Sequence, residues 1–172
     1  GLEDTPRAWI EMGTVHFSRL GADVIPVMVL DRRHAEDPRH AESIAAADWI
    51  YFSGGKPGYV VETLTGTPFW SAVVRRHLAG AVLAGASAGA MMLGSRTFHF
   101  PDGIADTGLP RRVAVRDALG LLPGMLVAPH FDAVPTEFWR TWAHLWQDGH
   151  RMLGIDEDTA IVERDDGWVV LG

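Results

Sequence analysis

The sequence predicts an α/β fold, with a mostly parallel, doubly wound sheet and helices on both of its faces. Short apolar runs alternate with amphipathic segments along the 172 residues, which is the pattern of strands joined by crossover helices. Residues 24–30 form a continuous aliphatic run, as expected of a strand covered on both faces. The sequence contains no repeat or low-complexity tract, so we expect a single domain over residues 1–172.

The expected elements follow in chain order. A proline in the first turn starts the helices over 6–20 and 68–78, and a glycine ends the first of them. The other expected elements are strands over 24–30, 49–52, 81–85, 96–100 and 125–131, helices over 41–46 and 135–147, and a terminal hairpin of 159–164 and 167–171. The charged segment 31–39 and most of 95–116 are expected to be irregular.

The composition excludes several classes of function. The formal net charge is −7 and the 15 lysines and arginines are scattered, which disfavours a nucleic-acid partner. No apolar run approaches the roughly 20 residues that cross a bilayer, so we expect no membrane partner. The chain has no cysteine, which excludes disulfides, thiolate metal sites and a cysteine nucleophile. No signal peptide opens the sequence, and we expect a cytoplasmic protein.

A glycine-bracketed serine follows one of the expected strands. The stretch 85–89 reads Gly-Ala-Ser-Ala-Gly, which fits the G-x-S-x-G pattern of a nucleophile elbow between a strand and a helix. The small residues let the strand and the helix approach closely, and the turn lifts the Ser87 hydroxyl above the sheet edge. The alternative is a small-residue turn in which Ser87 is only a helix N-cap.

A serine nucleophile needs a base, and His130 is the best-placed histidine. It ends the apolar run 125–129, so a parallel strand would bring it to the same carboxyl edge as Ser87. The alternative is a hydrogen-bonded histidine at a strand end with no catalytic role. Six of the other histidines fall on expected helix or loop surfaces: His16, His34, His40, His77, His144 and His150. The place of His99 is ambiguous.

The third member of a triad would be a carboxylate that orients the histidine. Asp102 and Asp106 follow the expected nucleophile helix, and Asp117 and Asp132 are less favoured candidates. An aspartate in a loop is more often a turn former, so spacing alone leaves the choice open.

Backbone amides could complete an oxyanion hole. Gly54 and Gly55 follow the expected strand 49–52, where glycines let N–H groups face a ligand, and the amide of Ala88 could be the second donor. A plain turn is the alternative. Lys56 stands beside this loop and could receive a substrate carboxylate, although a solvated lysine is more common.

Several segments together resemble one known family. The segments are YFSGG at 51–55, LAGASAGA at 83–90, ALGLLPGMLVAPHFD at 118–132 and LGIDEDTAIVE at 153–163. They are similar, in the same order, to segments of the dipeptidase E and cyanophycinase family of serine peptidases, whose fold is like the class I glutamine amidotransferase domain. The last segment is similar to one found especially in the cyanophycinase branch.

This resemblance implies a role for several residues. Ser87 matches the nucleophile, His130 the base, and Gly55 and Ala88 the positions whose amides form the oxyanion hole. The dipeptidase E branch has its acid fifteen residues after the serine, which is Asp102 here because 102 − 87 = 15. The cyanophycinase branch uses a slightly later glutamate that this sequence lacks, which leaves Asp106 as the fallback. No metal or organic cofactor is implied.

The sequence also departs from the family. Cyanophycinases usually carry Asp-Gln where residues 56–57 are Lys-Pro, and Arg-Gly-Arg where residues 132–134 are Asp-Ala-Val. Cyanophycin is therefore a doubtful substrate. The family also has a strand before the position of residue 1, so we expect the chain to lack that first strand, and with it any targeting segment it carried.

We therefore expect a serine peptidase or amidohydrolase that cleaves small peptides or isopeptides through an acyl-enzyme. The alternatives are an α/β-hydrolase-type esterase, a catalytically silent binding module of the same fold, and an interaction protein. The oligomeric state stays open: three tryptophans could form a homodimer interface, although their helical spacing favours a place in the core. They are Trp139, Trp142 and Trp146.

Overall fold

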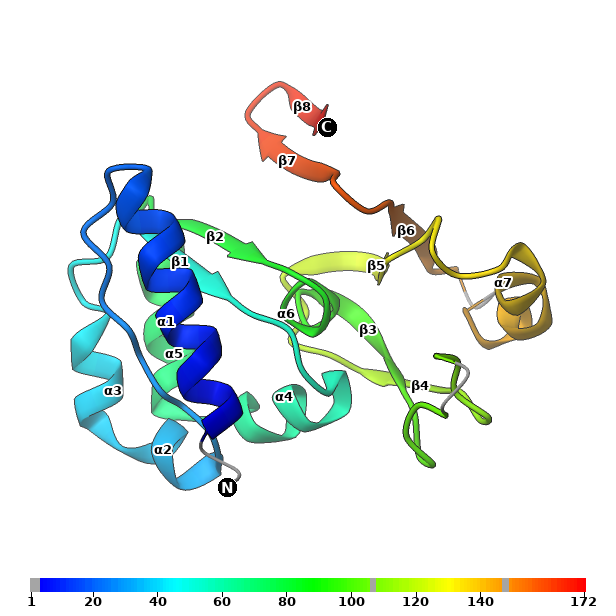
Figure 1. The fold of residues 1–172 in the computed structure, drawn as a ribbon, viewed down its shortest axis with the longest axis horizontal. Helices are drawn as coiled ribbons and strands as arrows, with labels where there is room; N and C mark the ends of the chain where they lie inside the picture. The colour runs from blue at the N-terminus through cyan, green and yellow to red at the C-terminus, as the bar shows by residue number, and fades with distance from the viewer. Residues whose placement is uncertain (1–3, 106–107, 147–148) are drawn as a thin grey trace. The chain divides into compact units, whose positions relative to one another are not determined.

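The computed structural model describes residues 4–105, 108–146 and 149–172. Figure 1 shows the order of its helices and strands along the chain. Its contacts divide the chain into two compact units, the first made of residues 1–50 and 62–83, and the second of 51–61 and 84–172. Within the described ranges, no helix has the length and apolar character needed to cross a membrane. The site discussed below belongs to the second unit.

The first unit is mainly helical. Its helices are α1 (Asp4–Arg19), α2 (Arg32–Glu36), α3 (Pro38–Ser43) and α5 (Pro68–Leu78). Helix α5 spans the residues that the sequence predicts, and Thr67 caps its N-terminus because its hydroxyl accepts the Trp70 N–H at 3.3 Å. Helices α2 and α3 both contact α5, and the buried side chains of this region include Ala35, Leu64, Phe69, Trp70 and Val73.

The region before α5 differs from the sequence-based expectation. Residues 24–30 are not assigned to a strand, and Ile25 is 59% exposed. Pro26 lies within this run and has no N–H to donate to a ladder, which weakens the prediction of a central strand. The expected loop 31–39 contains α2, since Asp31 caps that helix, and the helix expected at 41–46 is α3, which starts three residues earlier.

Two short strands carry the chain between the units. They are β1 (Trp49–Phe52) and β2 (Val82–Gly85), which pair with each other. Hydrogen bonds join Val82 N to Asp48 O and Ala86 N to Phe52 O, and the equal separation of these partners (82 − 48 = 86 − 52) is the pattern of parallel strands. The sequence predicts both strands. It does not predict α4 (Pro57–Leu64), which follows β1.

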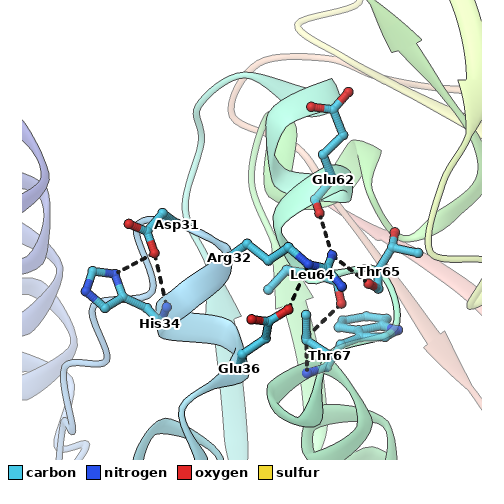
Figure 2. A network of polar contacts seen from close by, with 9 residues as sticks. Asp31, Arg32, His34, Glu36, Glu62, Leu64, Thr65 and Thr67 are labelled. Atoms are coloured by element: carbon cyan, nitrogen blue, oxygen red, sulfur yellow. Dashed lines mark hydrogen bonds and ion pairs between the residues drawn. The ribbon is translucent and has the colours of Figure 1, made fainter.

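Arg32 binds the C-terminal end of α4. Its Nη1 donates to the carbonyl oxygens of Glu62 at 3.1 Å and Thr65 at 3.0 Å, and its Nε donates to Glu36 (Figure 2). The last carbonyl groups of a helix have no partner within the helix, so a guanidinium that satisfies them stabilises the end of α4.

The second unit contains a four-stranded sheet in the order β4-β3-β5-β6. The strands are β3 (Gly94–His99), β4 (Ala114–Asp117), β5 (Leu122–Pro129) and β6 (Arg151–Ile155). Strand β5 is parallel to both β3 and β6, and only the edge strand β4 runs antiparallel. This is the α/β fold with a mostly parallel sheet that the sequence predicts, although β4 and β6 were not expected.

The expected terminal hairpin is present as β7 (Ala160–Arg164) and β8 (Gly167–Leu171), which pair antiparallel. The helix predicted over 135–147 is α7 (Thr136–Trp142) followed by a 3₁₀ turn over 143–146. Trp139 and Trp142 pack against a buried core cluster, as their helical spacing favoured, whereas the side chain of Trp146 lies outside the described part of the chain. The cluster consists of Met91, Phe98, Val113, Leu126 and Ala128.

Candidate active site

Ser87 stands on a sharp turn between β2 and the short helix α6 (Ala88–Met91). Its backbone has φ 52° and ψ −121°, a region that residues other than glycine rarely occupy. Such a conformation costs on the order of 1–3 kcal/mol and persists only where the surroundings enforce it.

Two glycines enforce this turn through backbone contacts. A Cβ on Gly85 would overlap the Gly89 carbonyl group and lie 2.7 Å from Ala90 N. A Cβ on Gly89 would in turn overlap the Phe52 carbonyl oxygen and lie 2.8 Å from the carbonyl oxygen of Ser53. Strand and helix therefore approach more closely than any side chain permits, as the G-x-S-x-G spacing suggested.

The hydroxyl of Ser87 is directed to a histidine. Ser87 occupies the N-cap position of α6, but its side chain makes no capping hydrogen bond. Its Oγ lies 3.1 Å from His130 Nε2, so the two side chains singled out in the sequence are within hydrogen-bond distance. The N-cap alternative therefore does not account for this serine.

His130 directly follows the last residue of β5 and has a positive φ of 57°. Its Nδ1 lies 2.6 Å from Glu157 Oε1. An ionised carboxylate can only accept hydrogen bonds, so the proton of the neutral ring belongs on Nδ1, and Nε2 is left to accept the Ser87 hydroxyl proton. This tautomer follows from the hydrogen-bond network.

Glu157 was not among the expected site residues. It lies two residues beyond the end of β6, which pairs in parallel with β5 through the register pair Pro129 and Ile155. Both strands therefore end at one edge, and His130 and Glu157 follow them there. Recognition of 151–155 as a strand would have made Glu157 a candidate together with its neighbours Asp156 and Asp158, because the edge rule that selects His130 applies to every residue that follows the strand.

The carboxylates that the sequence favoured lie elsewhere. Asp102, expected to orient His130, is instead 3.5 Å from Arg112 Nη2, and both side chains are more than half exposed. Asp106 lies outside the described residues. Asp117 pairs with Arg96 at 3.1 Å. The position on the imidazole ring that was expected of Asp102 is occupied by Glu157, whereas Asp102 lies beside Arg112.

The glycine loop after β1 lies next to Ser87. A Cβ on Gly54 would be 3.2 Å from Ser87 Cβ and 3.5 Å from Ser87 Oγ. Gly55 has φ +154°, and among the described residues neither its N–H nor that of the buried Ala88 donates a hydrogen bond. Lys56 is exposed. No three His, Cys, Asp or Glu side chains in the described ranges are grouped so that they could hold a metal ion.

The His130–Glu157 pair contributes little to stability by itself. The two side chains are 47% and 53% exposed, and ion pairs of that exposure are typically worth between 0 and about 1 kcal/mol. The significance of the pair is therefore geometric. It fixes the orientation of the imidazole ring and the tautomer that faces Ser87.

Comparison with known proteins gives consistent matches. The chain is 30% identical over 162 residues to the cyanophycinases of Trichormus variabilis and of a Nostoc species, an alignment that covers 91% of this chain and 53% of each relative. It is similar to the crystal structure of a peptidase from an acI-B1 actinobacterium, with 31% sequence identity and a TM-score of 0.82 over 99% of this chain and 68% of that one. The chain thus spans about half the length of the curated relatives it matches.

The family assignment rests on nearly the whole sequence. The sequence model of peptidase family S51 matches residues 4–171, which include the serine turn, His130 and Glu157. The chain belongs to peptidase family S51.

Proposed function

We propose that this protein is a serine peptidase or amidohydrolase whose triad is Ser87, His130 and Glu157. The observation that carries the proposal is the continuous hydrogen-bonded chain from Ser87 Oγ through both ring nitrogens of His130 to Glu157 Oε1, at 3.1 Å and 2.6 Å. Membership of a peptidase family supports it independently. Glu157 takes the role for which the sequence favoured Asp102.

The reaction starts with transfer of the Ser87 proton to His130 Nε2. The Ser87 alkoxide attacks the carbonyl carbon of the scissile amide and forms a tetrahedral intermediate. Glu157 stabilises the imidazolium that His130 becomes, and His130 then gives the proton to the leaving nitrogen as the C–N bond breaks. A water molecule, deprotonated by His130, hydrolyses the acyl-enzyme and restores the serine.

The amides of Gly55 and Ala88 would bind the developing oxyanion. Their N–H groups make no other hydrogen bond among the described residues, which leaves them available to a ligand. One such donor is typically worth about 3 kcal/mol in the transition state. Gly54, whose lack of a side chain leaves space beside Ser87 Oγ, and the exposed Lys56 would contact the substrate.

The substrate we propose is a small peptide or isopeptide. Similarity to two cyanophycinases supports an enzyme of the cyanophycinase or aspartyl-dipeptidase kind. The exposure of His130 and Glu157 is consistent with a site that is open to a peptide. We also propose that residues 1–172 act as one catalytic domain with the doubly wound, class I glutamine amidotransferase-like fold. The family match over residues 4–171 supports this view.

A fluorophosphonate probe tests the nucleophile. Attack by Ser87 Oγ would displace fluoride from phosphorus and leave a stable adduct on this residue, identified by mass spectrometry of the digest. We expect labelling of the wild-type chain and none of Ser87→Ala. Ser95→Ala is the matched control, since this second half-buried serine of the same unit donates to Met125 O rather than to a histidine, and we expect it to be labelled normally.

The same experiment contains the outcome that would reject the proposal. Failure of folded wild-type protein to react, over a range of probe concentrations and pH, would favour a binding module that retains the fold without the chemistry. Labelling of Ser87→Ala to the wild-type level would show that another side chain is the nucleophile. If Ser87 is labelled, assays with panels of isopeptides and of ordinary dipeptides would show which class of substrate the enzyme cleaves.

A further inference from the structure

Three contacts join the residues after β5 to the last residue of β6 and to Glu157 beyond it. His130 Nδ1 lies 2.6 Å from the Glu157 carboxylate, and the Phe131 N–H donates to the carbonyl oxygen of Ile155 at 3.0 Å. The third contact involves Asp132, whose Oδ1 accepts the backbone N–H of Glu157 at 2.8 Å. Consecutive residues on one side therefore bind both the backbone and the side chain of the other segment.

Glu157 needs such support because the regular strand pairing ends before it. The last register pair between β5 and β6 is Pro129 and Ile155, so no ladder fixes the backbone of residues 156–157. The Glu157 side chain is 53% exposed and receives little restraint from packing. A glutamate has several rotatable bonds, so holding its side chain in one conformation carries an entropy cost.

We propose that Asp132 is a positioning residue that holds the Glu157 backbone at the point from which its carboxylate reaches His130. This inference rests on the proposed function, because it assigns Asp132 a role in the same reaction. With the Glu157 N–H bound, both ends of Glu157 are fixed: its amide by Asp132 and its carboxylate by His130. Asp132, two residues after the base His130, thus holds the acid Glu157 in place.

The contact requires an acceptor oxygen at residue 132, but it does not require a negative charge there. Asp132 Oδ1 binds a neutral N–H group, and the amide oxygen of asparagine accepts such a bond with the same geometry. Alanine removes the acceptor, so the backbone N–H of Glu157 can then donate only to water. The pair Asp132→Ala and Asp132→Asn therefore separates the hydrogen bond from the charge.

The experiment measures how fast Ser87 reacts with a fluorophosphonate in the full 172-residue chain. The rate constant at saturating probe reports the chemical step, and the half-saturating concentration reports binding. We expect Asp132→Ala to lower the saturating rate constant by about 10-fold, since the imidazole is less well oriented, with the half-saturating concentration unchanged. Asp132→Asn should restore at least half of the wild-type rate constant. Asp156→Ala removes an exposed carboxylate of the same loop and should react as wild type does.

A proton NMR signal provides a readout that a purely structural role would not change. The Nδ1–H of a histidine in a short bond to a carboxylate resonates far downfield, and loss of the signal in His130→Ala assigns it. We expect the signal to disappear or broaden in Asp132→Ala and to return in Asp132→Asn, while thermal unfolding of all three variants stays within a few degrees of wild type.

The outcomes separate this inference from the proposed function. If wild type reacts and Asp132→Ala reacts equally fast with the downfield signal retained, Asp132 has no positioning role, although the triad stands. The role is also rejected if Asp132→Asn is as slow as Asp132→Ala. If wild type does not react at all, the proposed function fails, and retention of the downfield signal in Asp132→Ala would then overturn the positioning role on its own.

Discussion

The two sides of the candidate site are built in different ways. Ser87 is held by backbone against backbone: Gly85 and Gly89 leave no space for a methyl group, and Ala88 beside it is completely buried. His130 and Glu157 are half exposed and are held by hydrogen bonds between two loops. A steric constraint fails abruptly when one carbon is added, whereas hydrogen bonds can be weakened one at a time. Substitutions around Ser87, on the serine side, should therefore abolish its reaction or leave it unchanged. Substitutions around His130 and Glu157, on the acid side, should lower stability and reaction rate by degrees.

The largest expected effect is that of Gly85→Ala. The added methyl would overlap the backbone carbonyl of Gly89, and a backbone group cannot move aside without disrupting the turn. We expect a loss of about 3 kcal/mol of unfolding free energy or more and no reaction of Ser87 with a fluorophosphonate. Urea unfolding and probe labelling measure the two effects.

The control for this variant is Gly13→Ala, in the middle of α1. A Cβ there would meet nothing within 4 Å, so this variant should be stabilised by about 0.5–1 kcal/mol, the usual gain from replacing glycine in a helix. Wild-type stability and labelling in Gly85→Ala would contradict the view that steric contact fixes the elbow.

The second expected effect distinguishes Glu157 from Asp102. Glu157→Gln keeps the shape of the side chain but removes the charge that stabilises a protonated His130, and we expect the labelling rate constant to fall about 10³- to 10⁴-fold, as for the acid of other serine triads. Asp102→Asn weakens only an exposed contact with Arg112 and should change the rate less than twofold. Neither should alter stability by more than about 0.5 kcal/mol. The reverse order of the two rates would return the role of the acid to Asp102.

The residues of the candidate site also show where sequence reasoning succeeds and where it fails. Ser87 and His130 each follow an apolar run, so their strands could be recognised and their meeting at one edge predicted. Glu157 follows 151–155, a run that begins with arginine and contains glycine, and its acidic neighbours suggest a solvated turn. Nothing local distinguishes it from Asp102. Its role depends on the pairing of β6 with β5, a contact between segments far apart in sequence.

The run at 24–30 illustrates the opposite error. Its apolar composition is typical of a buried strand, yet the structure does not assign residues 24–30 to a strand. Hydrophobicity reports what a segment prefers to bury, whereas strand assignment needs a neighbouring chain in register. The strands 49–52 and 82–85 have such a neighbour in each other, and the sequence predicts both correctly.

An intermediate effect is expected for Gly154→Ala, on the acid side. A Cβ on Gly154 would lie 2.7 Å from two ring carbons of Phe131, the residue after His130. The ring is half-buried and can shift, so we expect a graded loss: about 1–2 kcal/mol of stability and about a 10-fold slower labelling of Ser87. Chemical denaturation and labelling kinetics measure both.

A compensating variant makes that prediction specific. Gly154→Ala combined with Phe131→Leu replaces the flat ring with a smaller side chain, and the double variant should be less destabilised than the sum of its two single variants. Strict additivity would mean that the contact between these two residues is not the cause.

The smallest expected effect is that of Trp139→Phe, which tests how gradual the acid side is. The Trp139 indole N–H donates to the Phe131 carbonyl oxygen at 3.2 Å, and the two rings stack with centroids 5.1 Å apart. Phenylalanine keeps an aromatic ring and loses the donor, which should cost about 1 kcal/mol, or about 2–4 °C in melting temperature for a protein of this size. Trp142→Phe, in the same helix and against the same core cluster, changes the ring without removing that bond.

Since Phe131 also remains bound to Ile155 through its own N–H, its backbone should hold its place and the labelling rate should stay within twofold of wild type. A rate loss as large as that expected of Gly154→Ala would mean that the His130 loop is as intolerant of change as the serine turn, and the contrast between the two sides would not hold.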